Sequence, residues 1–227
     1  MMSLPKENQM KKRRVGMAVV TAALLPFTVA FAGGGWWVHT VENLPEYFVV
    51  GEPVEMSISL RQHGMTLTSL GPVMEVHLTG PNSAAQTLKA TPTARPGYYT
   101  ANVVVSEPGE WSIAVQSGIM RLNLLPLRAI AAEDTPPARL TPVERGRHLY
   151  AAKGCVTCHG NSVAVADPTG SFGYVTGVGV APELIGTPIS REYVEQVLAN
   201  PERRMMPNLN LSRDEIGAIA AFLHSDS

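Results

Sequence analysis

The stretch Cys155-Val156-Thr157-Cys158-His159 decides how the C-terminal part of this 227-residue chain must fold. Two cysteines separated by two residues and followed directly by a histidine form the pattern of a c-type haem attachment site. The spacing suits the chemistry, because each thiol adds across one vinyl group of the porphyrin and the histidine then lies under the iron as its proximal ligand. We therefore expect one covalently attached haem c, held by Cys155, Cys158 and His159.

Two other kinds of site use a pair of cysteines at this spacing. A zinc site needs a second pair of cysteines or histidines, and the chain has only 2 cysteines. A redox dithiol of the thioredoxin kind follows a strand in a βαβ unit, and no such pattern surrounds Cys155. Haem attachment is therefore favoured, and because it uses both thiols we expect no disulfide.

The N-terminus has the three parts of a secretory signal. Basic residues at 11–14 precede an uncharged, largely apolar run over 15–32, which ends in the small-x-small sequence Ala30-Phe31-Ala32. We expect residues 1–32 to be a signal peptide. The alternative is an uncleaved membrane anchor, because the uncharged run continues to Val38 and is long enough to span a bilayer. In both cases the rest of the chain lies in the periplasm or at the outer face of the cytoplasmic membrane.

Charge and composition exclude one class of partner. Removal of residues 1–32 takes away five basic residues and one acidic residue, which leaves a net formal charge of about −5. The sequence has no basic patch with interleaved aromatic residues, so we expect no nucleic acid partner. A membrane is expected as a partner only if the N-terminal segment stays uncleaved.

Residues 36–125 have the pattern of short strands. Val54, Met56, Ile58 and Leu60 alternate with polar residues, which is the period of a half-buried strand. The same alternation returns in four later segments, separated by Pro-Gly and Gly-Pro turns: 74–78, 99–105, 111–115 and 120–124. Six or seven strands in about ninety residues predict a β-sandwich.

Residues 126–140 are expected to be a linker, because they contain Pro136-Pro137 within a polar stretch. We expect this linker to separate the sandwich from every haem contact, so that the domain at 141–227 keeps its redox centre without the sandwich. Hydroxyl caps mark the helices of that domain. Thr141-Pro142-Val143-Glu144 and Ser212-Arg213-Asp214-Glu215 are capping boxes, and Ser190 caps a middle helix over 191–199.

From Thr141 onward the chain resembles the class I cytochrome c family. The resemblance rests on the capped first helix, the Cys155–His159 motif, the segment Ala181-Pro182-Glu183-Leu184-Ile185-Gly186, and Met206-Pro207 shortly before the last helix. It implies an all-α domain around a single haem. The sandwich, with its turns Pro96-Gly97 and Pro108-Gly109, resembles small immunoglobulin-like periplasmic domains of copper-handling and oxidase-accessory proteins.

The cytochrome resemblance also implies residue roles. The axial ligands of the iron would be His159 and Met206, with Met205 and His224 as the less favoured alternatives to Met206. The carbonyl of Pro182 would accept a hydrogen bond from the ring of His159 and fix its orientation. Other residues would pack against the haem or between the helices: Leu184 on the haem, and Gly146 and Tyr150 on the C-terminal helix.

These features predict an electron carrier of a periplasmic respiratory chain and no catalytic residues, because no paired carboxylate or nucleophile–base set is present. The expected partners are a terminal oxidase and a quinol-oxidising complex. One alternative is the electron-delivering haem subunit of a periplasmic dehydrogenase. Another is a copper-handling oxidase accessory protein, in which His63, Met65, Met74 and His77 of the sandwich offer soft ligands.

The N-terminal pattern gives a first testable prediction. The protein purified from its native host should begin at Gly33, because signal peptidase cleaves after a small-x-small sequence such as Ala30-Phe31-Ala32. Intact-mass spectrometry checks this directly. A mass that still includes residues 15–32 would show that the segment is an anchor.

Overall fold

The computed structural model describes residues 37–69, 73–118, 120–159, 184, 188–201 and 206–225. The chain divides into two units, residues 1–35 and 36–227, and the described residues all belong to the second. The apolar run at 15–32 is outside them, so the choice between signal and anchor stays a prediction. Within the described ranges, the helices are too short or too polar to cross a bilayer.

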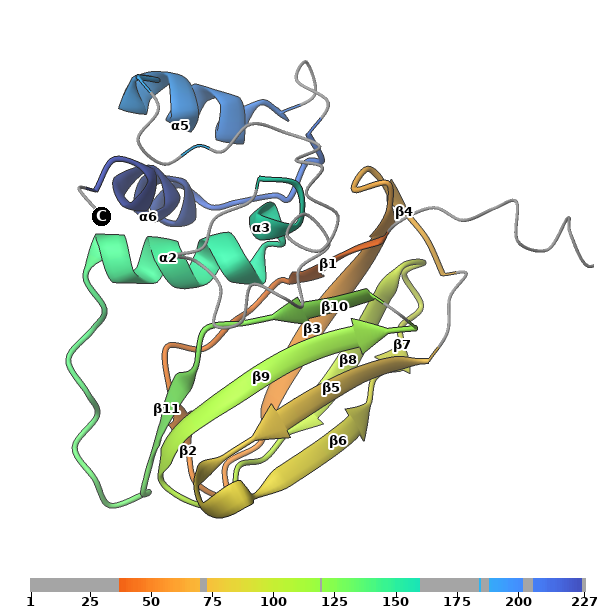
Figure 1. Ribbon diagram of the computed structural model, residues 1–227, viewed down its shortest axis with the longest axis vertical. Helices are drawn as coiled ribbons and strands as arrows, with labels where there is room; N and C mark the ends of the chain where they lie inside the picture. Colours follow the sequence, from red (N-terminus) through yellow and green to blue (C-terminus); the bar gives the residue numbers. More distant parts are fainter. Residues whose placement is uncertain are drawn as a thin grey trace, which may run out of the picture. The chain divides into compact units, whose positions relative to one another are not determined.

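The described residues from 37 to 130 form two β-sheets (Figure 1). All strand pairs are antiparallel except the parallel pair of β2 with β11. The first sheet contains β1 (Trp37–Val41), β3 (Val54–Gln62), β8 (Tyr98–Val103) and β7 (Thr91–Pro92), with β4 (Thr66–Leu67) beside β3. The second contains β2 (Phe48–Val49), β11 (Leu127–Ile130), β9 (Gly109–Ser117), β5 (Met74–Thr79) and β6 (Ala85–Lys89), with β10 (Met120–Asn123) beside β9; a short 3₁₀ turn, η1, covers Pro81–Ser83.

The alternating residues of the sequence form the core of this β-rich region. Met56, Ile58 and Leu60 of β3 are at most 1% exposed, and Trp111 of β9 is fully buried. The five strands predicted from the alternation are therefore confirmed as β3, β5, β8, β9 and β10. Strand β6 was not predicted, because it lies at a sheet edge and its residues are exposed or half-buried, which leaves no strong apolar period.

The second sheet extends further along the chain than the predicted domain boundary at 125. β11, at Leu127–Ile130, lies inside the range 126–140 that the sequence predicts as a linker, and it pairs with both β9 and β2. Leu127, Ala129 and Ile130 are buried. The connection to the first helix is thus shorter than the composition of the linker suggests.

Three helices of the C-terminal part begin where their hydroxyl caps predict: α2 (Pro142–Ala152), α5 (Arg191–Ala199) and α6 (Arg213–Leu223). The short helix α3 (Cys155–Cys158) lies between α2 and α5 and was not predicted from a cap. Both capping boxes are present, with Thr141 and Glu144 at α2 and Ser212 and Glu215 at α6. The hydroxyl of Ser190 accepts a hydrogen bond from the backbone N–H of Tyr193 at 3.2 Å, as expected of the N-cap of α5.

Helices α2 and α6 pack at a very close crossing. A Cβ atom on Gly146 would overlap the carbonyl oxygen of Ala218 and lie 2.8 Å from the Cβ of Phe222, so only glycine permits this approach. One turn further along α2, the ring of Tyr150 lies 5.6 Å from the ring of Phe222 at an angle of 59°. The predicted contact of Gly146 and Tyr150 with the C-terminal helix is confirmed.

The β-rich part and the helical part are in direct contact next to the cysteine motif, a contact that the expectation of a separating linker did not include. A Cβ on Gly154 would overlap the carbonyl oxygen of His39 in β1, and the backbone of Gly154 therefore lies against that strand. The hydroxyl of Thr40 donates to the carbonyl oxygen of Lys153 at 3.3 Å. The sequence places the two parts at opposite ends of a proline-rich stretch, but it holds no signal for this contact.

A buried histidine lies in the same strand. His39 is 2% exposed, and its Nε2 lies 2.7 Å from the hydroxyl of Ser117 in β9. Burial lowers the pKa of His39 from 6.5 to about 4, because the imidazolium would lose its hydration inside the sandwich. The neutral ring is thus the form that fits the folded protein.

This gives a prediction for stability in acid. As the pH falls through 6.5, His39 becomes protonated in the unfolded chain. In the folded protein it stays neutral until the pH reaches about 4. Between these values the free energy of unfolding should fall by about 3 kcal/mol on account of this group. In His39→Gln that part of the slope should vanish, as measured by denaturant unfolding from pH 4 to 8. A slope equal to that of the wild type would contradict the prediction.

Candidate haem site

The cysteine motif occupies one short helical turn. Gly154, with φ at +75°, adopts the left-handed conformation that turns the chain from α2 into α3. Cys155 and Cys158 are three residues apart in α3 and therefore lie on the same side of the turn. His159 is the C-cap of α3, and the hydroxyl of Tyr150 donates a hydrogen bond to the carbonyl oxygen of His159 at 3.2 Å. The closely packed helix α2 thus fixes the position of His159.

A partly open cavity of about 90 Å³ lies beside this turn. Its walls come from α2, α3, α5 and α6 and from the residues between them, and they are mostly aliphatic. The lining residues are Tyr150, Cys155, His159, Leu184, Ile189, Tyr193, Val194, Val197, Leu198, Met206, Ile219 and Leu223.

Four of the six predicted site residues line this one cavity: Cys155, His159, Leu184 and Met206. Cys158 is half-buried in the same turn as Cys155. Pro182 lies outside the described residues, and so does Met205, the alternative to Met206. The structure therefore brings together side chains that lie up to fifty-one positions apart in the sequence.

The two thiols do not have the environment of a redox dithiol. Burial is the main cause that raises the pKa of Cys155 to about 12, and burial likewise raises the pKa of Cys158 to about 11. The pKa of a catalytic or redox cysteine usually lies well below the ordinary value for a thiol, because the thiolate is the reactive form. Both groups are thus neutral thiols beside an apolar cavity, which is unfavourable for disulfide exchange.

His224 is not placed to bind a metal. Its Nδ1 lies 2.8 Å from the carbonyl oxygen of Ala220, and its Nε2 lies 2.7 Å from that of Ile189. Both ring nitrogens are thus engaged with backbone carbonyls, and His224 does not line the cavity. The ring instead joins the end of α6 to the residue before the cap of α5.

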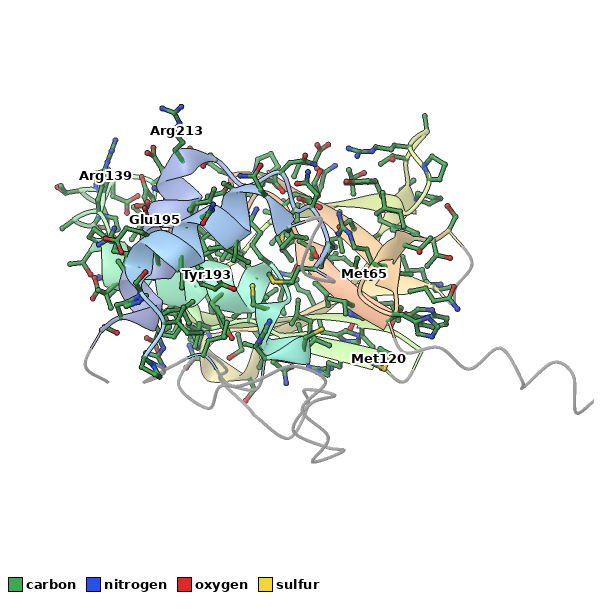
Figure 2. All side chains as sticks on the ribbon, turned by 90° about the horizontal axis from the view of Figure 1, so that it is seen from above. Met65, Met120, Arg139, Tyr193, Glu195 and Arg213 are labelled. Atoms are coloured by element: carbon green, nitrogen blue, oxygen red, sulfur yellow. The ribbon has the colours of Figure 1, made fainter. Side chains whose placement is uncertain are left out.

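Two of the soft ligands proposed for copper, Met74 and His77, do not face each other. Met74 is buried in the core, whereas His77, three residues along β5, lies on the outer face with its Nε2 3.2 Å from Glu75 and its Nδ1 3.3 Å from Thr87. Met65 is 45% exposed and lies away from α5 and its Tyr193 (Figure 2). Within the described ranges, no three His, Cys, Asp or Glu side chains gather as a metal site.

The contribution of α5 to the cavity was not predicted. Tyr193, Val194, Val197 and Leu198 all line it, yet no residue of this helix is fully buried. A signal for this role was present in the sequence, because positions i, i+1, i+4 and i+5 form one apolar face. The sequence did not indicate what this apolar face packs against. In the structure, part of the face borders the cavity and not another helix or strand.

The residues present fit a haem c group. Two neutral thiols lie on one turn, and an imidazole and a thioether line the same apolar cavity. Thioether bonds to the vinyl groups need the two thiols, and His and Met are a ligand pair known for c-type haem iron. The aliphatic walls suit the flat apolar face of a porphyrin.

The comparison with protein families supports this assignment. Residues 141–223 match the family described as cytochrome C oxidase, cbb3-type, subunit III. This part of the chain is therefore similar to a cytochrome c domain. No match was found among curated proteins.

Solved structures resemble the chain only distantly. A mutant of Salmonella alpha-2-macroglobulin is 19% identical over 47% of this chain and 7% of its own, with a TM-score of 0.36. Domains 4 and 5 of the S-layer protein SbsC are 15% identical over 43% of this chain and 54% of theirs, with a TM-score of 0.30. A superoxide reductase (neelaredoxin) from Ignicoccus hospitalis is 11% identical over 41% of this chain and 83% of its own, with a TM-score of 0.27. These similarities assign no function.

The site predicts that haem is attached through two thioether bonds. Acid-acetone treatment of the matured protein should leave the haem on the polypeptide, because thioether bonds survive acid. In Cys155→Ala one vinyl group should stay free, and the α-band of the pyridine haemochrome should move to longer wavelength. Extraction of the haem from the wild-type protein into the solvent would contradict the assignment.

Proposed function

We propose that the protein is a monohaem c-type electron carrier that works outside the cytoplasm. Cys155 and Cys158 hold the haem covalently, and His159 and Met206 are the axial ligands of its iron. The observation that carries the proposal is that Met206 lines the same apolar cavity as Cys155 and His159, which lie together in a distant segment of the chain. The family match over 141–223 supports the same chemistry.

The bound haem would supply a single iron that changes between the ferrous and ferric states. The chain's own residues determine how this occurs. Two protein ligands on the iron leave no position for a substrate, which favours electron transfer over catalysis. Tyr150 holds the backbone of His159, and the aliphatic side chains of α5 and α6 give the cavity an apolar wall. A neutral thioether ligand and an apolar wall would both disfavour the extra charge of ferric iron, so the reduction potential should be positive.

Two further residues have supporting roles in the proposal. Leu184 packs on the face of the haem, in keeping with its place in the cavity wall. By the cytochrome resemblance, the carbonyl of Pro182 would accept a hydrogen bond from the His159 ring, which would orient the imidazole and raise its basicity. This second role rests on the cytochrome resemblance alone.

A terminal oxidase is the proposed electron acceptor, and a quinol-oxidising complex the proposed donor. The matched family is described as a subunit of a cytochrome c oxidase, which supports an oxidase over a dehydrogenase as the partner. The periplasm is the proposed location, with residues 1–32 as the export signal. We further propose that the two-sheet part is an immunoglobulin-like domain, on the basis of its two packed sheets.

The axial ligation gives a direct test. The ferric protein should show the weak near-infrared band of a methionine sulfur bound to iron. Met206→Ala should abolish this band and lower the reduction potential, because water or another weak ligand replaces the thioether. The ferrous form of Met206→Ala should then bind carbon monoxide, which visible absorption spectroscopy detects.

Two control variants make this test specific. Met205→Ala removes the neighbouring methionine, and Met65→Ala removes an exposed methionine of the β3–β4 turn; both should keep the band. Loss of the band in Met205→Ala with its retention in Met206→Ala would reverse the assignment. A wild-type protein that lacks the band and binds carbon monoxide readily would instead point to an open-site haem enzyme.

A further inference from the structure

A buried lysine lies at the point where the sandwich meets the haem-binding turn. The side chain of Lys153 is 3% exposed, and its ammonium lies 2.9 Å from Oε1 of Glu215. The same ammonium donates to the carbonyl oxygen of Glu42 at 2.6 Å. A buried charge is tolerated only when it is paired, and here its two partners come from different parts of the fold.

These partners connect Lys153 to both proposed axial ligands. Lys153 precedes Cys155 by two residues and so lies at the start of the turn that carries His159. Glu215 belongs to the capping box of α6, where its Oε2 accepts from the backbone N–H of Ser212 at 2.8 Å. Ser212 ends the segment that begins at Met206. One ammonium therefore joins the proximal segment to the end of the distal segment.

The third connection runs to the sandwich. Glu42 directly follows β1, and Thr40 within β1 donates its hydroxyl to the carbonyl oxygen of Lys153. The hydroxyl of Thr40 also accepts a hydrogen bond from the buried guanidinium of Arg61 in β3 at 3.4 Å, and this second bond fixes the orientation of the hydroxyl. Together with the contact of Gly154 on β1, these bonds leave the start of the haem-binding turn little freedom to move.

We propose that Lys153 is a positioning residue through which the β-sandwich sets the reduction potential of the haem. Its ion pair with Glu215 and its bonds to β1 hold the His159 turn and the Met206 segment at a fixed separation, which keeps the bond from the methionine sulfur to the iron strong. The proposal rests on the His/Met ligation proposed above.

The test compares two variants of the ion pair in the full-length holoprotein. Positioning predicts that Lys153→Met and Glu215→Gln both weaken the methionine–iron bond, so both lower the midpoint potential and reduce the near-infrared band. A purely electrostatic role predicts opposite signs. Loss of the positive charge would stabilise ferric iron and lower the potential, whereas loss of the negative charge would raise it.

External imidazole measures the strength of the methionine bond directly, because it competes with the sulfur for ferric iron. In both variants the imidazole dissociation constant should fall about tenfold, the effect of ~1.4 kcal/mol at the ligand. Thr40→Val, which removes the sandwich hydroxyl, should change the constant in the same direction by less. Glu195→Gln is the matched control, because Glu195 on α5 pairs with Arg191 at 2.8 Å but is 40% exposed (Figure 2); it should change neither quantity.

The possible outcomes separate a positioning role of Lys153 from an electrostatic role and from a purely structural one. A raised potential in Glu215→Gln would overturn the positioning role even if Lys153→Met fails to mature. Variants that unfold more easily but keep the wild-type potential and imidazole affinity would show that Lys153 is only structural. An unchanged imidazole affinity in Thr40→Val would overturn the part assigned to the sandwich. A wild-type protein without the near-infrared band would refute the His/Met ligation itself, whereas a normal band with unaffected variants would refute only this inference.

Discussion

The close crossing of α2 and α6 is the constraint on which the haem-binding part depends. Gly146 lets the two helices approach until backbone meets backbone, and Tyr150 then packs on Phe222 one turn later. This crossing places the end of α2, and with it the cysteine turn, beside the end of the segment that carries Met206. Any side chain larger than hydrogen at Gly146 would separate the helices and widen the cavity between them. The precision of the site thus comes from a residue that does not touch it.

The β-rich part contacts the helical part directly and is not only joined to it by the linker. Its first strand supplies the surface on which Gly154 lies and the hydrogen bonds that fix Lys153. The contact is made of backbone atoms and buried polar groups, so it has a defined geometry that a patch of apolar side chains would not have. Through these contacts the sandwich can restrict the movement of the neighbouring cysteine turn.

The alternatives for the cysteine pair are separated by environment more than by sequence. A dithiol, a half zinc site and a haem anchor share the same spacing, but redox and zinc chemistry use the thiolate, whereas a haem anchor needs an apolar cavity beside the thiols. The raised pKa values of Cys155 and Cys158 and the aliphatic residues of α5 agree with that requirement. The half-buried apolar face of α5 has the same explanation, because a helix that borders a cofactor pocket need not bury its face in protein.

The sequence by itself determined the local elements and the chemistry. Capping residues such as Thr141, Ser190 and Ser212 specify helix starts through bonds to their own neighbours, and the Cys155–His159 spacing specifies the cofactor through covalent reach. Alternation predicted the central strands for the same local reason. Only the tertiary structure decided that β11 extends the second sheet, that α5 lines the cavity, and that Lys153 joins Glu42 to Glu215. These contacts unite residues as many as 111 positions apart, and pairing at that distance depends on how whole elements pack, which no local pattern encodes.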